Sequence, residues 1–396
     1  MDESPKKKKL KYSDVGIDVK KIKSLQYLMG KSIASTHVLP RKGNVVTGFG
    51  HYAGIIRFGD LLFSMHTDGV GSKILIAQMM NKYDTIGIDC VAMNVNDTIC
   101  VGATPVGYLS YVALQETNDT LLNDLTKGLV KGARLSNMAI VGGETAILPD
   151  IITGFREKYN FDLAGMCLGV QQRNRIMLGD SIRNEDVIIG LKSSGLHSNG
   201  YTLARKILLD KYKIDEKPEF LKSTVGKELL KPTAIYTKPV LNVIESFGRK
   251  IHGLAHITGG AFTKLGRLNQ KVDFILDSLP QIKGIFKQLQ IDGVMDVEEM
   301  YRTFNMGIGF CVVAPKKESD HIITALANEG VESTKIGHIK GNGSGATYLK
   351  VLADEKDKEI EKGRKREMGR EIVHRIEREL ARGRKSSKSS STLVKL

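Results

Sequence analysis

Three carboxylates that stand beside glycines carry the first chemical signal in this sequence. Asp68 enters the glycine-rich turn of MHTDGVGSK, Asp97 lies in the polar segment NVND of a largely apolar stretch, and Glu144 follows two glycines in VGGETA. A carboxylate next to glycines that leave backbone N–H groups accessible suits Mg²⁺, which proteins hold through one or two carboxylates and substrate phosphates. One such residue is more often an ordinary Asp-Gly turn. Three in similar contexts favour a site for a metal and a nucleotide.

Two further polar residues accompany these carboxylates. Asn94 lies three residues before Asp97, so both side chains share one face of the helix expected there. A carboxylate in a buried helix has to be paired, metal-bound or hydrogen-bonded to a neighbouring loop, because an unpaired buried charge is strongly disfavoured. Lys73 ends the MHTDGVGSK turn, which lacks the G-x-x-x-x-G-K-[ST] spacing of a Walker A loop.

Two loops offer groups for anion binding and proton transfer. In VVTGFGHYAGII, Gly48, Gly50 and Gly54 allow backbone amides to approach an anion, although such glycine clusters are more often plain turns. The loop SSGLHSNG at 193–200 contains His197, a residue type that can act as general acid or base near neutral pH. The alternative is a surface histidine that caps the following helix.

Two polar turns with glycines follow in the second half of the chain, AHITGGAF and YRTFNMGIG, each next to an apolar strand. Arg302 in the second turn could grip a phosphate through charge-assisted hydrogen bonds. The alternative is an arginine in a surface salt bridge.

The elements that must position these residues follow an α/β pattern. From residue 64 to residue 170, short apolar runs alternate with helix-length segments, which predicts sheets covered by helices. We expect a mostly buried helix within 84–102, a second helix over 119–137 and a short buried strand over 138–142.

The composition turns polar between residues 173 and 185, where we place a domain boundary. The sequence therefore predicts an α/β (α+β) protein of two domains, 12–175 and 176–352, with a basic arm at 1–11 and a basic, helical or disordered tail at 353–396.

The composition of the 396-residue chain excludes several classes of protein. A hydrophobic content of 41% with 41 glycines is ordinary for a globular protein and argues against a disordered or fibrous chain. No run approaches the roughly 20 apolar residues of a membrane span. The basic N-terminus is followed by no apolar segment of the kind that a secretory signal needs, so we expect a cytoplasmic protein.

The cysteine spacing and the charge distribution indicate which metals and ligands the chain is expected to bind. The four cysteines form no C-x-x-C pair, which predicts buried free thiols and neither a disulfide framework nor a zinc site. Of the net charge of +15, residues 1–31 and 354–396 carry +5 each. Because the rest of the chain is nearly balanced, a phosphorylated small molecule is at least as good a partner as a nucleic acid, for which we expect at most weak contact through the tail.

The motifs, taken in their order, strongly resemble those of one enzyme family. They are DVGID at 14–18, GFG at 48–50, HTDGVGSK, YDTIGIDCVAMNVNDTICVGATP, VGGETA, DLAGMCLGV, SSGLHSNGYTLARKIL, LAHITGGAF and MYRTFNMGIG. This set is similar to the phosphoribosylformylglycinamidine cyclo-ligases, the aminoimidazole ribonucleotide synthetases of purine biosynthesis. The resemblance extends from about Tyr12 to Leu352.

The resemblance implies a reaction and an architecture. ATP activates the formamide oxygen of formylglycinamidine ribonucleotide as an imino-phosphate, a nitrogen attacks, and phosphate leaves as the imidazole closes. The implied cofactors are ATP and Mg²⁺, with K⁺ as a further expected ion. The implied fold has two domains, as in selenophosphate synthetase, and the N-terminal sheets pair into a barrel in a homodimer.

The resemblance also implies roles for individual residues. Catalytic roles fall to His197, Asn199 and, from its position near the N-terminus, Lys31. The expected metal ligands, which also face the nucleotide, are Asp68, Asp97 and Glu144. The other expected nucleotide-binding residues are Gly48, Gly50, Gly69, Lys73 and Asn94. The expected substrate-binding residues are Ser193, Ser194, Ser198, Thr258, Gly259, Gly260, Arg302 and Asn305.

The sequence departs from the family pattern at three places. TGGAF replaces the usual TGGGF, so that Ala261 narrows the backbone conformations open to this turn. GFG is followed by HYAG instead of a shorter GA run, which is expected to alter how that loop closes. The tail after Leu352 has no counterpart in the family core.

Related ATP-dependent families and one unrelated function are the alternatives. A selenophosphate synthetase needs a Cys or selenocysteine near its N-terminal glycine loop, whereas the first cysteine here is Cys90. A hydrogenase-maturation dehydratase ends in a reactive cysteine, whereas this chain ends in STLVKL, and a thiamine-monophosphate kinase shows paired aspartates where this chain has TDGVG. A nucleic-acid-binding or scaffolding role would rest on the basic ends and would show a steep salt dependence of binding.

Overall fold

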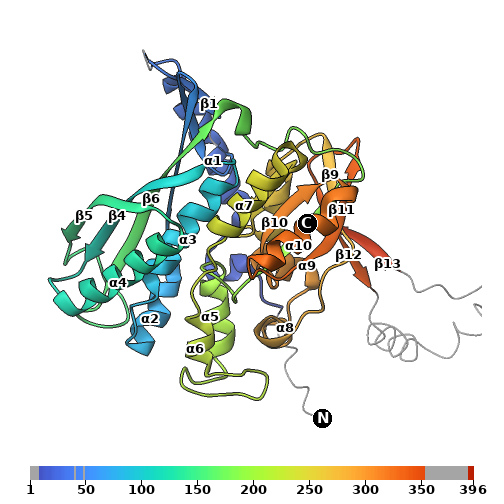
Figure 1. Cartoon of the computed structure of the whole chain (residues 1–396). Helices are drawn as coiled ribbons and strands as arrows, with labels where there is room; N and C mark the ends of the chain where they lie inside the picture. The colour runs from blue at the N-terminus through green and yellow to red at the C-terminus, as the bar shows by residue number, and fades with distance from the viewer. Residues whose placement is uncertain (1–8, 40–41, 48–49, 353–390) are drawn as a thin grey trace, which may run out of the picture.

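The protein folds into two α/β units that lie side by side (Figure 1). The computed structural model describes residues 9–39, 42–47, 50–352 and 391–396. The sheet of the first unit ends at Gln172 and that of the second begins at Val187.

The first unit is a six-stranded sheet with helices on one face. Its strands are β1 (Asn44–Thr47), β2 (Gly54–Phe58), β3 (Leu61–Gly69), β4 (Thr104–Leu114), β5 (Ala139–Ile147) and β6 (Phe161–Gln172). Its helices are α1 (Val19–Ile33), α2 (Ile74–Met80), α3 (Ile86–Ile99) and α4 (Asp119–Leu135). The strand order is β1-β2-β3-β6-β4-β5, and all neighbours are antiparallel except β4 and β5.

The second unit is a seven-stranded sheet in the order β13-β12-β9-β11-β7-β10-β8. Its strands are β7 (Val187–Lys192), β8 (Gly253–His256), β9 (Val272–Leu276), β10 (Ile308–Ala314), β11 (Ser333–Gly341), β12 (Thr347–Leu352) and β13 (Ser391–Lys395). Its helices are α5 (Tyr201–Leu209), α6 (Val225–Leu229), α7 (Thr237–Phe247), α8 (Gly284–Asp292), α9 (Val297–Thr303) and α10 (Ser319–Asn328). A 3₁₀ turn, η6 (Ala261–Arg267), follows β8.

Helix α3 lies between the two units and is buried along its whole length. It packs on β3, β4, β6 and α4 of the first unit and also contacts α7 and β8 of the second. Its crossing with α4 is close because glycines meet there: a Cβ on Gly87 would lie 2.1 Å from the backbone N of Leu129. Because no larger residue fits at that position, the glycine lets α3 sit deep enough to hold residues 94–97 against the second unit.

The other face of the first sheet keeps exposed apolar side chains. Within the described residues, Met65, Leu109, Tyr111 and Val141 have exposed fractions between 37% and 69%. We call these four residues the open sheet face. Water contact with so much apolar surface is unfavourable, so this face is a candidate for association.

One predicted strand differs in the structure. The sequence predicts a short buried strand over 138–142, but β5 extends to Ile147 and is exposed along almost its entire length. The physical reason is its place at the sheet edge, where only β4 pairs with it.

The last residues also differ from the prediction. The sequence predicts a helical or disordered tail over 353–396, yet β13 pairs antiparallel with β12, and the backbone N–H of Leu396 donates to the carbonyl of Thr347 at 2.8 Å. The edge of β12 offers free backbone groups, and Thr392 and Val394 favour an extended strand. Residues 1–8 and 353–390 lie outside the described residues.

Two expectations from composition can be compared with the structure. Cys90, Cys100, Cys167 and Cys311 are buried free thiols, as predicted. Among the helices that the structure describes, none has the length and apolar character that crossing a membrane requires.

Candidate active site

The centre of the candidate site is Asp97, which emerges from α3 and is surrounded by three basic side chains. Nδ1 of His256 lies 2.6 Å from Oδ1 of Asp97. Nε2 of His66 and Nζ of Lys264 lie 3.5 Å and 3.9 Å from Oδ2. We call these four residues the Asp97 cluster. His66 comes from β3, whereas His256 and Lys264 come from β8 and η6, so both units contribute to the cluster.

The charges of the Asp97 cluster follow from burial and from mutual attraction. Burial alone would raise the pKa of Asp97, but Lys264, His66 and His256 together hold it below its ordinary value. Burial lowers the pKa of His256 more than Asp97 raises it. At neutral pH the cluster therefore holds an ionised carboxylate hydrogen-bonded to a neutral imidazole, with Lys264 beside it.

Asp68 lies close to this cluster and is positioned through its backbone. The side chain of Asn94 accepts a hydrogen bond from the Asp68 N–H at 2.9 Å and donates to the Asp68 carbonyl at 3.0 Å. This pair of bonds fixes the end of β3 to α3. Burial, and then the charge of Asp97, raise the pKa of Asp68. In the part of the chain that the structure describes, the Asp68 carboxylate forms no ion pair within 4 Å.

Lys73 lies in a separate buried network beneath the site. Its Nζ lies 2.8 Å from Oδ1 of Asp89, and neither side chain is exposed. The same carboxylate oxygen accepts from the Thr233 N–H at 2.7 Å and from Ser198 Oγ at 3.3 Å. Lys73 is thus committed to Asp89, and the network ties the first unit to the loop at 193–200.

That loop places His197 and Asn199 next to the Asp97 cluster. Nε2 of His197 accepts the backbone N–H of Ser194 at 3.2 Å, so the ring proton of the neutral imidazole is on Nδ1, which is buried without a partner among the described residues. Burial, and then the neighbouring His256, hold the pKa of His197 well below its ordinary value. The His197 and His256 ring centres are 6.5 Å apart.

The TGG turn completes this side of the site. Lys264 Nζ donates a hydrogen bond to Thr258 Oγ1. A Cβ on Gly259 would lie 3.0 Å from Oδ1 of Asn199, so the turn and the loop approach closely. Gly260 and Ala261 both have positive φ, at +80° and +41°. Ala261 therefore occupies a left-handed conformation that disfavours residues with a Cβ, at the position where the family pattern has glycine.

Three of the expected substrate-binding residues form hydrogen bonds that stabilise the loop at 193–200. Nδ2 of Asn305 donates to the carbonyl of Gly195 at 2.8 Å, and Ser193 Oγ donates to Asn305 Oδ1 at 3.2 Å. Ser194 Oγ donates to the carbonyl of Pro232 at 2.6 Å. These bonds hold the loop in shape.

Three expected residues lie away from the cluster. Glu144 is exposed on the edge strand β5 and is separated from β3 by two strands. Lys31 is exposed on α1. Arg302, in the last turn of α9, pairs with Glu298 one turn earlier at 2.5 Å and donates to the carbonyl of Lys395 in β13 at 3.0 Å. The phosphate-gripping role expected for Arg302 and the metal role expected for Glu144 are therefore not supported by their placement.

The glycine loop is described in part. Gly48 lies outside the described residues, and Gly50 has a φ of +118°, which glycine alone adopts readily. Gly69 donates its backbone N–H to Oδ1 of Asp68 at 2.8 Å and so helps to orient that carboxylate.

Sequence reasoning missed three of the four residues of the Asp97 cluster. His66 precedes Asp68 by two residues, which places both side chains on the same face of a strand. This spacing indicates that His66 lies beside Asp68 in the site. His256 ends the strand before the TGG turn. No local sequence pattern identifies Lys264 as a site residue, because only the fold brings η6 close to α3.

The carboxylates of the candidate site fit a metal ion only as a single protein ligand. Within the described residues no group of three or more His, Cys, Asp or Glu side chains could hold a metal ion. The predicted set of Asp68, Asp97 and Glu144 is not assembled, because Glu144 is remote and Asp97 already has basic partners. Of these three carboxylates, Asp68 is the one that could bind a metal. It would be the only protein ligand of a metal that is held mainly by phosphate oxygens.

Comparisons with known proteins agree with this architecture. The family "AIR synthase related protein, N-terminal domain" matches residues 50–171, and "AIR synthase related protein, C-terminal domain" matches residues 183–350. The phosphoribosylformylglycinamidine cyclo-ligase of Methanocaldococcus jannaschii is 44% identical over 331 residues, which are 83% of this chain and 91% of the relative. That of Methanothermobacter thermautotrophicus is 45% identical over 337 residues, 84% of this chain and 95% of the relative.

A solved structure of AaThiL complexed with AMPPCP and TMP shares the fold. Its TM-score is 0.57 at 16% identity, and the match covers 84% of this chain and 95% of that one. The two family matches together span both units of the fold, and each sequence relative matches more than four fifths of this chain. The resemblance drawn from the motifs is confirmed, and the chain belongs to the phosphoribosylformylglycinamidine cyclo-ligase family.

Proposed function

We propose that this chain catalyses the ATP-dependent cyclisation of formylglycinamidine ribonucleotide to 5-aminoimidazole ribonucleotide, a step of de novo purine biosynthesis, in the cytoplasm. The observation that carries the proposal is the Asp97 cluster, which joins one acidic and three basic side chains from the two units in one buried site. Family membership supplies the identity of the substrates and the products, which include ADP and phosphate.

The reaction has two stages. The formamide oxygen attacks the γ-phosphorus of ATP, so an O–P bond forms and the bond to ADP breaks. A nitrogen of the substrate then attacks the activated carbon. A C–N bond forms, the C–O bond to phosphate breaks, and the nitrogen loses a proton. Catalysis therefore needs fixed positive charge near the phosphoryl group, close positioning and a route for one proton.

Lys264 and His66 supply the electrostatic part of this scheme. Both lie within 4 Å of Asp97 Oδ2, and Nε2 of His66 is buried without a hydrogen-bond partner among the described residues, so it is available to a substrate oxygen. Side chains that are already oriented need no rearrangement when charge develops on a transferred phosphoryl group. Thr258 holds Lys264 from the other side.

His256 is our candidate for the proton route. Its Nδ1–H donates to Asp97, and its basic Nε2 lies 3.4 Å from Nδ2 of Asn96, a long contact that a substrate proton donor would replace. His197 has its Nε2 occupied by the Ser194 N–H, so we assign it a hydrogen-bonding role through Nδ1–H. Asn199, beside the TGG turn, is placed to orient substrate.

We also propose that the enzyme uses Mg²⁺ and K⁺. Asp68 would be the protein ligand of Mg²⁺, which when bound neutralises charge on the ATP phosphates. K⁺ is expected from the family, and turnover compared in potassium and sodium salts tests it.

The open sheet face supports a homodimer. Met65, Leu109, Tyr111 and Val141 form an apolar surface on the uncovered side of the first sheet. We propose that two copies pair these faces so that the two sheets form a barrel. Pairing identical faces satisfies both copies at once, as twofold symmetry requires.

The proposal is tested by incubating the purified protein with ATP and formylglycinamidine ribonucleotide and measuring aminoimidazole ribonucleotide, ADP and phosphate. We expect the three products in equal amounts. ATP consumption with thiamine monophosphate or selenide as acceptor, and no ring closure, would contradict the proposal and favour a related family.

A further inference from the structure

A cavity of about 630 Å³ opens beside the Asp97 cluster. It lies between the β1–β2 hairpin, α1, β3 and η6, and we call it the hairpin pocket. His66 belongs to both the pocket lining and the Asp97 cluster. A group bound in the pocket would therefore lie next to the site already described.

The hairpin pocket is rich in basic and hydrogen-bonding groups. Its described lining includes Arg267 and three histidines, His37, His51 and His66, but no aspartate or glutamate. Thr47 and Thr67 also line it, but their hydroxyls already donate to the carbonyls of Ala53 and Gly165. A cavity that contains a guanidinium and whose described lining has no carboxylate favours an anion.

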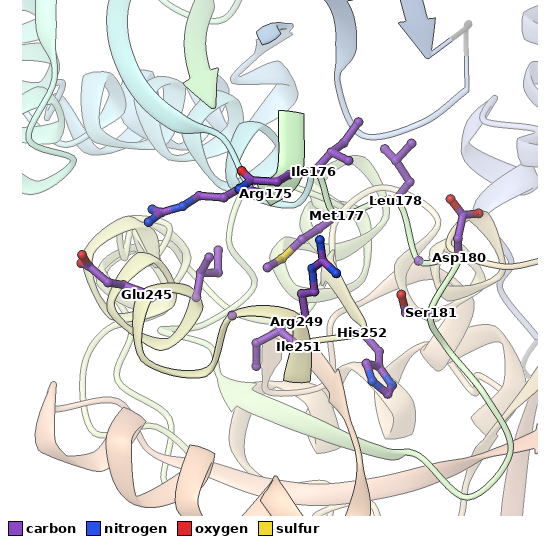
Figure 2. Close-up of a pocket in the computed structure, with 14 residues that line it drawn as sticks. Arg175, Ile176, Met177, Leu178, Asp180, Ser181, Glu245, Arg249, Ile251 and His252 are labelled. Atoms are coloured by element: carbon purple, nitrogen blue, oxygen red, sulfur yellow. The ribbon is translucent and has the colours of Figure 1, made fainter. Parts of the chain in front are cut away.

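A second cavity of about 440 Å³ offers a contrast within the same protein (Figure 2). There Arg175 and Arg249 share the lining with the carboxylates of Asp180 and Glu245. An arginine alone thus does not distinguish the hairpin pocket. The distinction is the absence of carboxylates from its described lining.

Arg267 has unused hydrogen-bonding capacity. It is half-buried, and in the described part of the chain it forms neither a hydrogen bond nor an ion pair. A guanidinium carries five N–H donors in a planar fork that matches the oxygens of a phosphate. Removing such a group from water without a partner is unfavourable, which indicates a ligand that is bound from outside the chain.

His51 gives a second, independent sign at the same place. Its Nε2 lies 3.3 Å from the carbonyl of Leu178, while its Nδ1 is buried with no partner among the described residues. Burial lowers the pKa of His51, and the charge of Arg267 lowers it further. Because Nε2–H donates to the Leu178 carbonyl, Nδ1 of the neutral ring is an acceptor, which suits a protonated phosphate oxygen or a ribose hydroxyl beside the Arg267 guanidinium.

We propose that the hairpin pocket is a phosphate-binding subsite of the active site, with Arg267 as the residue that anchors the phosphate and His51 beside it. The inference rests on the proposed function, because both of its substrates carry phosphate: the triphosphate of ATP and the 5′-phosphate of the ribonucleotide. Arg267 lies one turn beyond Lys264 in η6, so one short segment would serve both the bound phosphate and the reacting one.

The test measures KM for ATP and for formylglycinamidine ribonucleotide in the full chain and in three variants, Arg267→Ala, Arg267→Lys and Arg249→Ala. Loss of an arginine–phosphate contact is expected to raise one of the two KM values about 10- to 100-fold in Arg267→Ala. The substrate whose KM rises is the one whose phosphate occupies the pocket. Arg267→Lys keeps the charge but loses the planar fork, so a smaller rise is expected, and this variant decides the matter if Arg267→Ala does not fold. Arg249→Ala, the matched arginine of the second cavity, should leave both values within about twofold.

A folded Arg267→Ala with both KM values unchanged would overturn the inference. Titration calorimetry with ADP and with ribose 5-phosphate separates this failure from that of the proposed function. If the wild type makes no product but binds one of these probes, and Arg267→Ala weakens that binding at least 10-fold, the ligase proposal fails and the subsite stands. If neither probe binds the wild type, or if the variant binds both equally well, the subsite is refuted.

Discussion

Nδ1 of His256 lies 2.6 Å from Oδ1 of Asp97, and this contact joins the two α/β units at the centre of the candidate site. Asp97 belongs to α3 of the first unit and His256 ends β8 of the second. Because each unit contributes one member of the pair, the site depends on the docking of α3 against the second sheet.

Replacing His256 tests the proton route. His256→Gln should lower kcat for product formation about 100-fold or more, the usual scale for loss of a general acid or base. His252 provides a matched control, because its Nδ1 also lies 2.6 Å from a carboxylate, Asp186, outside the site. His252→Gln should destabilise the fold to a similar extent but leave kcat within about twofold. Equal losses of kcat in both variants would show that the effect of His256 is only structural.

Lys73 should matter for stability and not for nucleotide affinity. Its ion pair with Asp89 is fully buried, so Lys73→Met leaves an uncompensated buried carboxylate and should lower the free energy of unfolding by about 3–5 kcal/mol. Urea denaturation measures this loss. The KM for ATP of the folded variant should stay within about twofold. A stable Lys73→Met with a greatly raised KM for ATP would instead support the nucleotide-binding role predicted from the sequence.

Stability should fall as the pH drops below about 6.5. The unfolded chain binds a proton at His197 near that pH, whereas burial keeps the folded residue neutral, because its pKa is well below the ordinary value. The unfolded state therefore binds more protons, and the free energy of unfolding decreases with falling pH; above pH 6.5 His197 contributes no slope. His197→Gln should reduce the slope in urea titrations between pH 5 and 8. His256 and His51 titrate in the same direction, so part of the slope remains.

A His197→Gln slope identical to that of the wild type would contradict the neutral, buried state of His197.

The open sheet face should hold two copies together. Leu109→Glu places a charge in the middle of this apolar surface, and burying an unpaired charge at an interface is strongly unfavourable. Light scattering should report a dimer for the wild type and a monomer for Leu109→Glu. Thr126→Glu, on the exposed side of α4, should remain a dimer. A wild-type monomer, or a Leu109→Glu dimer of unchanged affinity, would contradict the proposed pairing.

Local patterns in the sequence predicted those parts of the fold that local physics determines. The apolar run after Asp84 is helix α3, and the segment beginning at Asp119 is helix α4. Burial of Asp97 followed from its place in an apolar helix, and a buried carboxylate required a partner. The partners themselves, His256 and Lys264, lie more than 150 residues away in sequence, so no local pattern could identify them.

The predictions about Glu144 and about the tail both depend on position within a sheet, which the sequence does not reveal. Glu144 follows two glycines as Asp68 does, but β5 is an edge strand and β3 is not, and only the strand order distinguishes them. Likewise the polar tail predicted from composition ends in a strand, because the edge of β12 offers backbone partners that the sequence does not reveal. Position within a sheet is a long-range property, whereas residue type and spacing are local ones.

The most direct test of the central claim is the rate at which Asp97→Asn converts formylglycinamidine ribonucleotide to aminoimidazole ribonucleotide with ATP, measured beside the wild type and Glu144→Gln. Asparagine keeps the shape of Asp97 but removes the charge that holds Lys264, His66 and His256. We predict a fall in kcat/KM of at least about 100-fold for Asp97→Asn, and a value within about twofold of the wild type for Glu144→Gln. A folded Asp97→Asn with wild-type turnover would contradict the claim that the Asp97 cluster is the active site.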